Sequence, residues 1–135
     1  MLIRVASSAD VSSLLALWAA ADAIPSATDD VDGVRLAIES GVVLVAEEAG
    51  VVVGSLIAAF DGWRGNLYRL AVHPDHRRNG LATRLVEAGE QRLRDAGCRR
   101  ITALVVTEED HATAFWRSAG YDFDERIARY VKTTR

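Results

Sequence analysis

The amino-acid sequence predicts an α/β fold, in which helices cover the faces of a mixed sheet. Two kinds of pattern alternate along its 135 residues. Apolar runs of strand length stand at 2–5, 42–47, 51–60, 67–72 and 101–106. Between them lie segments whose apolar residues recur at helical spacing. Such an alternation of strands and helices is typical of a sheet with helices packed on its faces.

The first half of the chain supplies two helices and a hairpin. Ser7 and Asp10 form the pattern of a capping box, so we expect a helix to follow and to end before Pro25. A second helix is expected at about 30–40, where apolar residues again recur at helical spacing. The turn 48–50 separates two apolar runs and therefore predicts an antiparallel hairpin.

The second half begins with a strand that Pro74 terminates, because proline cannot donate to the ladder. From Gly80 the spacing becomes helical until Gly97, with Leu81, Leu85, Gly89 and Leu93 on one face. A close approach of this helix to the sheet would explain glycine in its middle, where it costs about 1 kcal/mol relative to alanine. A short helix at 112–119 and one or two closing strands within 121–132 complete the expected order.

Composition and charge narrow the class of protein. Half of the residues are apolar and 26% are charged, which predicts one globular domain over residues 1–135. No apolar run is long enough to span a membrane and no signal sequence is recognised, so we expect a cytoplasmic protein without a membrane partner. A net charge of -3 disfavours nucleic acid as a partner.

Cysteine and histidine usage disfavours disulfides and metal sites. Cys98 is the single cysteine, so an internal disulfide is impossible, and we expect it to be a small buried residue. His73 and His76 lack a third ligand of suitable spacing. The sequence therefore predicts no bound metal.

The segment 70–83 is where the sequence predicts a binding site. It passes from a strand through a polar loop into a helix, whose first turn has unpaired backbone N–H groups and the positive end of the helix dipole. Gly80 lets a ligand approach the backbone closely, and Arg77 and Arg78 add positive charge in planar donor groups. This pattern predicts a site for a pyrophosphate.

The loop resembles the pyrophosphate-binding signature of the GNAT superfamily of N-acetyltransferases, with Arg77, Gly80 and Ala82 at the matching positions. A second block, 112–121, resembles that family's Ala-x-x-Leu-Tyr-x-x-x-Gly-Phe pattern. The resemblance implies a mixed, mostly antiparallel central sheet of six to seven strands, flanked by about four helices. It also implies an opening between the fourth and fifth strands, and acetyl-CoA as cosubstrate. Its expected contacts are Leu70, Ala71, Val72, Arg77, Arg78, Asn79, Gly80, Leu81, Ala82, Thr83, Glu109 and Trp116.

The catalytic groups are not assigned by the resemblance. Trp116 stands where many members have tyrosine, and an indole cannot protonate a leaving thiolate, so packing is its favoured role. Glu109 stands where many members have asparagine, and Leu104 where some members that acetylate protein N-termini have glutamate. The general base is open, and the candidates for the acid or base are Tyr68, Glu108 and Tyr121.

The resemblance implies direct attack of an amine on the thioester, without a covalent enzyme intermediate. The acceptor is open among small molecules, peptide N-termini and lysines. One alternative is a catalytically weak sensor or partner-binding module that keeps the fold and binds acetyl-CoA, and another is transfer of a longer acyl chain. The chain is expected to be a monomer or a homodimer, because its strand edges could be covered or could pair between chains.

Overall fold

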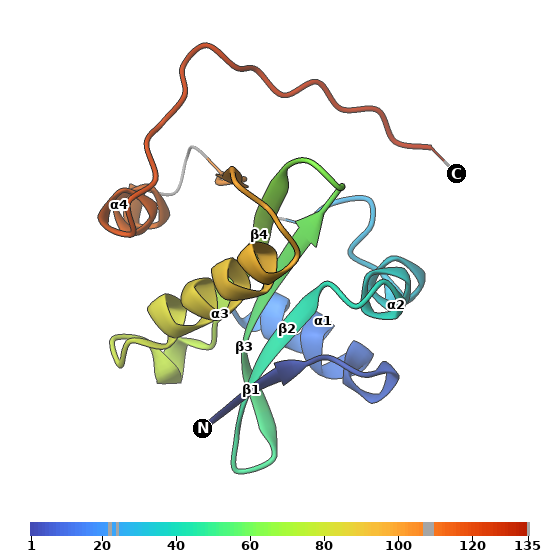
Figure 1. Ribbon diagram of the computed structural model, residues 1–135. Helices are drawn as coiled ribbons and strands as arrows, with labels where there is room; N and C mark the ends of the chain where they lie inside the picture. Colours follow the sequence, from blue (N-terminus) through green and yellow to red (C-terminus); the bar gives the residue numbers. More distant parts are fainter. Residues whose placement is uncertain (22, 24, 107–109, 135) are drawn as a thin grey trace. The chain divides into compact units, whose positions relative to one another are not determined.

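A twisted five-stranded sheet forms the centre of residues 1–104 (Figure 1). The structure is a computed structural model that describes residues 1–134 except 22, 24 and 107–109. Its strands are β1 (Leu2–Val5), β2 (Val43–Glu48), β3 (Val51–Phe60), β4 (Gly65–Val72) and β5 (Ile101–Ala103), which neighbour one another in chain order. Successive pairs are antiparallel from β1 to β4, and β4 and β5 are parallel.

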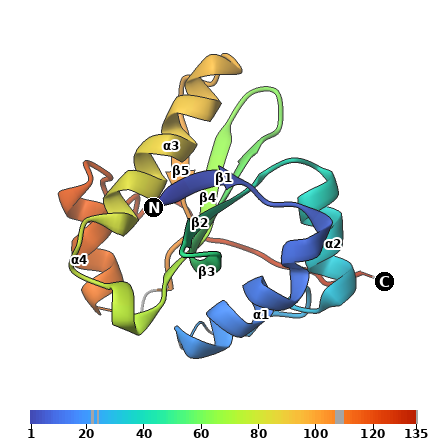
Figure 2. The same cartoon turned by 90° about the horizontal axis from the view of Figure 1, so that it is seen from below.

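Helices cover both faces of this sheet. The α-helices are α1 (Val11–Ala20), α2 (Val31–Glu39), α3 (Leu81–Asp95) and α4 (Asp110–Ser118), with short 3-10 turns η1 (Ser8–Asp10) and η2 (Pro74–His76). Figure 2 shows α3 on one face of the sheet and α1 and α2 on the other. By its contacts the chain divides into two units, Met1–Leu104 and Val105–Arg135, so α4 belongs to the second unit.

The core on the α1 face joins helices and strands that are distant in sequence. Its members are buried side chains from both helices and from the central strands, namely Leu14, Leu17, Trp18, Val34, Ile38, Val43, Val45 and Ile57. These are the positions that helical and strand spacing place on one face. The capping pattern is also present, since the Ser7 amide donates to Asp10 Oδ2 over 2.7 Å.

On the other face, Gly89 brings α3 against the sheet. A Cβ placed on Gly89 would lie 2.7 Å from Leu56 Cδ2 and 3.3 Å from Leu67 Cδ2. The first separation is shorter than a carbon–carbon contact, so no side chain fits at this position unless the Leu56 side chain moves. The glycine in mid-helix is therefore explained by the close packing that the sequence analysis suggested.

The expected number of six to seven strands is wrong, since the described residues form five. The strand expected at 101–106 is limited to β5, which pairs with residues 65–67 of β4. Arg69, with φ of +55°, leaves the extended conformation just beyond that ladder. The closing strands expected within 121–132 are absent from the described part of the second unit, whose Phe123, Ile127 and Tyr130 do not alternate as a half-buried strand requires.

No helix among the described residues is long and apolar enough to cross a membrane.

Candidate active site

The end of β4 and the start of α3 hold ten of the predicted cofactor residues in one continuous segment. His73 accepts the Asp75 amide through Nδ1 over 3.2 Å, and Pro74 opens η2. The Arg77 side chain contacts the end of β4, since its Nε donates to Val72 O over 3.2 Å. These local contacts turn the chain sharply between strand and helix.

The first residue of the turn into α3 is Gly80, with φ of +82° and open space around the position of a Cβ. Only glycine adopts this left-handed conformation without a steric cost. Arg78 nearby has φ of +69°, an uncommon conformation for a non-glycine residue. Strain of this kind tends to be retained at binding sites, where the backbone must present particular groups to a ligand.

The loop at the N-terminal end of α3 carries positive charge that no described carboxylate pairs with. Arg77 and Arg78 are exposed and make no ion pair with a carboxylate of the described residues. Asn79 Oδ1 accepts the Leu81 amide over 3.3 Å, a long contact that leaves this end of the helix accessible to an anion. The 15 residues of α3 place the positive end of a long helix dipole at the same point.

The loop before α3 is kept in place by buried side chains of α3 and by a contact between η2 and the hairpin of β2 and β3. Leu81 and Leu85 are fully buried, and a Cβ on Gly54 of β3 would lie 3.0 Å from Leu85 Cδ1. His76 Nδ1 lies 3.1 Å from Glu48 Oε2, which links η2 to the hairpin between β2 and β3. The polar loop is therefore held by the core beneath it.

A bulge interrupts β4 just before its end. Ser55 pairs with Ala71 and Ile57 with Tyr68, so two residues of β4, Arg69 and Leu70, lie opposite one residue of β3. A bulge of this kind bends the strand and changes the direction of its backbone groups. It includes Leu70, the first of the residues 70–72 that were expected beside the cofactor.

Two successive hydrogen bonds in the core hold the bulge in place. Trp18 Nε1 donates to Ser55 Oγ over 2.9 Å, and Ser55 Oγ donates to Arg69 O over 2.9 Å. Ser55 is 0% exposed, so these are its available partners in the dry core. Sequence reasoning missed this network, although a serine inside an otherwise apolar strand was the signal for it.

The Arg69 side chain links β4 to the segment between α1 and α2. Its Nη2 forms an ion pair with Asp29 Oδ2, and its guanidinium lies 5.2 Å from the Trp18 ring centroid. Both members of the ion pair are largely buried. The connection between the two helices is therefore fastened beside the bulged part of β4.

The remaining predicted residues are distributed differently. Tyr68 lies in β4 and packs half-buried against the α1-side core. Trp116 is 7% exposed in α4, with its ring centroid 5.4 Å from that of Phe115 and 5.1 Å from that of Tyr121. Trp116 and Tyr121 belong to the second unit, and Glu108 and Glu109 lie outside the described residues. In the described part of the chain, no three or more His, Cys, Asp or Glu residues form a group suited to a metal ion.

Comparison with known proteins decides the family. Residues 13–121 match the acetyltransferase (GNAT) family. The chain belongs to this family. An acetyltransferase of Sodalis glossinidius is 33% identical over 130 residues, which are 94% of this chain and 91% of that protein. An acetyltransferase of Photorhabdus laumondii is 38% identical over 117 residues, 85% of this chain and 81% of that protein.

Solved structures agree with the fold of this acetyltransferase. An aminoglycoside antibiotic 6'-N-acetyltransferase of Acinetobacter haemolyticus has a TM-score of 0.79, with 22% identity and full coverage of both chains. An N-acetyltransferase of Thermoplasma acidophilum in complex with coenzyme A has a TM-score of 0.80, with 15% identity, 92% coverage of this chain and 91% of that one. The predicted α/β fold and the predicted activity, acetyl-CoA-dependent N-acetyl transfer, are confirmed.

Proposed function

We propose that this acetyltransferase binds the pyrophosphate of acetyl-CoA at residues 77–83 and aligns the rest of the cofactor along residues 70–72. The observation that carries the proposal is the geometry at Gly80. A left-handed glycine with open space beside it begins a 15-residue helix, and two exposed arginines without a described carboxylate partner precede it in the loop. Backbone donors, a helix dipole and guanidinium groups together suit a diphosphate.

The residue types at this loop fit such a group. Backbone N–H groups at the start of α3 have no helical partner and can donate to phosphate oxygens. Arg77, tied to Val72 O through Nε, keeps its two terminal nitrogens for an anion. Ala82 and Thr83 in the first turn are small enough to let a phosphate approach the helix.

The end of β4 supplies the second part of the proposed site. Acetyl-CoA brings a thioester, whose carbonyl an amine can attack directly. A backbone N–H among Leu70, Ala71 and Val72 would stabilise the negative charge that develops on the thioester oxygen. The bulge at Arg69 and Leu70 supports this role, because it changes the direction of the backbone where this segment begins.

Proton transfer is assigned to three candidates. Tyr68, Glu108 and Tyr121 carry groups that can donate or accept a proton during the transfer. We further propose that Glu109 and Trp116 lie beside the cofactor. The burial of Trp116 between two aromatic rings supports a packing role for that residue and not an acid role.

We also propose that residues 1–135 act as one acetyltransferase domain in the cytoplasm, as a monomer or a homodimer without nucleic-acid or membrane partners. The family match at 13–121 supports the single domain, because it runs across the division at Leu104 between the two units. The acceptor is proposed to be an amine of a small molecule, a peptide N-terminus or a lysine.

The test is transfer of a labelled acetyl group from acetyl-CoA to a panel that contains an aminoglycoside, a polyamine, peptides with free N-termini and lysine peptides. Acetylation of at least one class at its amine is the expected result. Tight binding of acetyl-CoA without transfer to any member of a broad panel would instead favour the sensor, in which the same loop binds the cofactor without turnover.

A further inference from the structure

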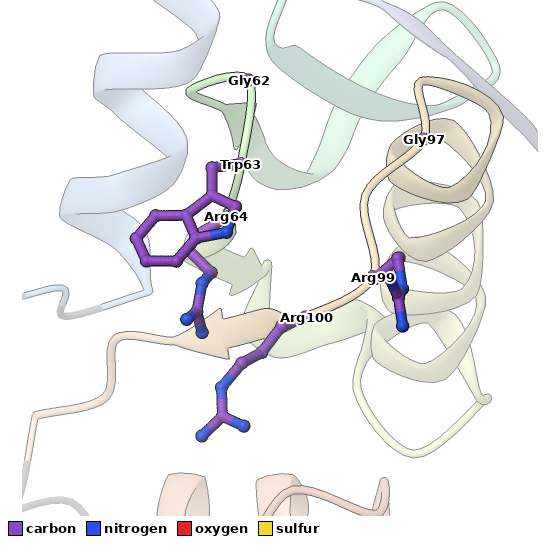
Figure 3. A pocket seen from close by; sticks show the side chains of 6 residues that line it. All are labelled: Gly62, Trp63, Arg64, Gly97, Arg99 and Arg100. Atoms are coloured by element: carbon purple, nitrogen blue, oxygen red, sulfur yellow. The ribbon is translucent and has the colours of Figure 1, made fainter.

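A hollow lies at the far end of α3 from the proposed cofactor loop (Figure 3). It has a volume of about 390 Å³ and is formed by the turn between β3 and β4 and by the segment between α3 and β5. The residues that line it are Gly62, Trp63, Arg64, Gly97, Arg99 and Arg100. Because α3 has 15 residues, about 22 Å of helix separates this hollow from Gly80.

Three guanidinium groups gather at this hollow. Figure 3 shows the side chains of Arg64, Arg99 and Arg100 extending from the two loops in a common direction. None of them forms an ion pair with a carboxylate of the described residues. The nearest acid in sequence, Asp61, accepts the backbone amides of Trp63 and Arg64 through Oδ1, over 2.8 and 2.7 Å. The protein carries net negative charge, so this concentration of positive charge is local.

An aromatic surface stands beside the charges. Trp63 is 73% exposed, and the Arg64 guanidinium carbon lies 4.0 Å from the centroid of its ring. Contact with a cation covers part of the indole and leaves most of the side chain open to a second ring. Exposed indoles are the platforms on which nucleic-acid bases stack in many proteins.

The hollow is held by the core and by backbone hydrogen bonds. The Gly65 amide donates to Arg100 O over 3.0 Å, and the Asp61 amide donates to Arg64 O over 3.1 Å. Cys98, buried beneath, donates from Sγ to Arg100 O over 3.2 Å. A Cβ on Gly65 would lie 2.8 Å from that sulfur, so the two loops meet without spare room. The backbone that carries these arginines is therefore held in place by contacts between the two loops.

We propose that this hollow binds a nucleoside polyphosphate, with the phosphates on Arg99 and Arg100 and the base against Trp63. Planar guanidinium groups form paired hydrogen bonds with both phosphate and carboxylate oxygens, but a polyphosphate offers two guanidinium groups more negative charge and more acceptor oxygens than a single carboxylate does. A hollow of 390 Å³ falls in the size range of small-molecule sites. The site is separate from the cofactor loop and does not depend on the function proposed for that loop.

The test is to titrate the full chain with ATP, with tripolyphosphate and with a hexaglutamate peptide. Calorimetry measures each affinity, and tryptophan fluorescence reports on the aromatic side chain. Trp18 and Trp116 are buried, so quenching by ATP reports on Trp63. The double variant Arg99→Ala/Arg100→Ala removes two of the charges, and Trp63→Leu removes the ring. Arg35→Glu on α2 is the control. It lowers the net charge as much as the double variant does, at an exposed position on a helix that covers the face of the sheet opposite α3.

We expect ATP to quench Trp63 and to bind at least about fivefold more tightly than tripolyphosphate, since stacking adds to the phosphate contacts. The double variant should bind ATP about tenfold more weakly or worse, because charge-assisted hydrogen bonds are lost. Arg35→Glu should bind as the natural protein does. In a Gly80→Val background the binding at this hollow should persist, which separates it from binding at the cofactor loop.

Three results would overturn the proposal. One is ATP affinity that is equal in the natural protein and in Arg99→Ala/Arg100→Ala. Another is tripolyphosphate binding as tight as that of ATP and insensitive to Trp63→Leu, which would mean that no base is recognised. The third is binding of hexaglutamate alone, which would identify the surface as a site for acidic peptides.

Discussion

Asp10 is a buried carboxylate that forms an ion pair with Arg4. Arg4 Nη1 lies 2.7 Å from Asp10 Oδ2 and Nη2 lies 3.0 Å from Oδ1, a paired contact that also brings Arg4 to Glu47. These side-chain hydrogen bonds from Arg4, more than any other cause, lower the pKa of Asp10 from its ordinary 3.8 to about 2. The charged carboxylate is therefore favoured by the folded state.

The stability should consequently fall in acid. Because the folded pKa lies below the unfolded one, this contribution is complete above about pH 4 and is lost as the pH falls towards 2, by on the order of 2 kcal/mol. Urea unfolding at several pH values measures it. Asp10→Asn should remove this part of the pH dependence, whereas the exposed control Asp32→Asn should keep it. An unchanged acid profile in Asp10→Asn would contradict the assignment.

Ser55 joins the Trp18 N–H to the Arg69 carbonyl through two hydrogen bonds. Ser55→Ala removes both bonds and takes the acceptor from the buried Trp18 N–H, so it should lower the free energy of unfolding by about 2–3 kcal/mol. Ser13→Ala, at an exposed position of α1, should change it by less than about 0.5 kcal/mol.

The same change should affect the reaction more than the binding of the cofactor. Ser55 holds the bulge at Arg69 and Leu70, next to the backbone proposed to stabilise the thioester oxygen, and has no described hydrogen bond to the pyrophosphate loop 77–83. We therefore expect kcat to fall by a larger factor than the KM for acetyl-CoA rises. Steady-state kinetics on the folded variant measure both constants. A rise in KM with kcat unchanged would show that the bulge supports cofactor binding instead of the chemical step.

At the scale of elements, α3 is fixed by its contact with the sheet at Gly89. Gly89→Val would place carbon atoms where Leu56 Cδ2 already lies, and overpacking of this kind costs typically about 1–3 kcal/mol. The expected result is a lower melting temperature. Glu87→Val on the exposed side of the same helix is the control for valine in a helix, and equal melting temperatures for the two variants would refute the close approach.

Elements whose signals are local were predicted well from the sequence. The capping pattern at Ser7 and the turn at 48–50 each depend on neighbours a few residues away. The closing strands were predicted wrongly, because apolar residues near the C-terminus were taken for strands although their spacing does not alternate. Pairing with a distant strand, and not local propensity, decides whether such a segment joins a sheet.

At the scale of the whole molecule, the parts of the candidate site differ in how far the sequence predicts them. The strand, loop and helix of 70–83 are continuous in the chain, so their residues could be placed together from the sequence. The contacts of Ser55 join residues 37 and 14 positions away, and the hollow lined by Trp63 and Arg100 joins two loops between which β4 and α3 lie in the sequence. Pairs so distant along the chain meet only in the folded molecule, which is why sequence reasoning missed them.

The proposed function depends on the backbone at the start of α3 binding the diphosphate of acetyl-CoA. Calorimetric titration of acetyl-CoA into Gly80→Val tests this binding. The control is Gly41→Val at the end of α2, because Gly41 also has a positive φ, +74°, and open space at its Cβ, so both variants carry similar backbone strain. We expect similar melting temperatures for the two variants, an affinity for acetyl-CoA at least about tenfold weaker in Gly80→Val and no loss of affinity in Gly41→Val. Acetyl-CoA bound by Gly80→Val as tightly as by the natural protein would contradict the proposed binding.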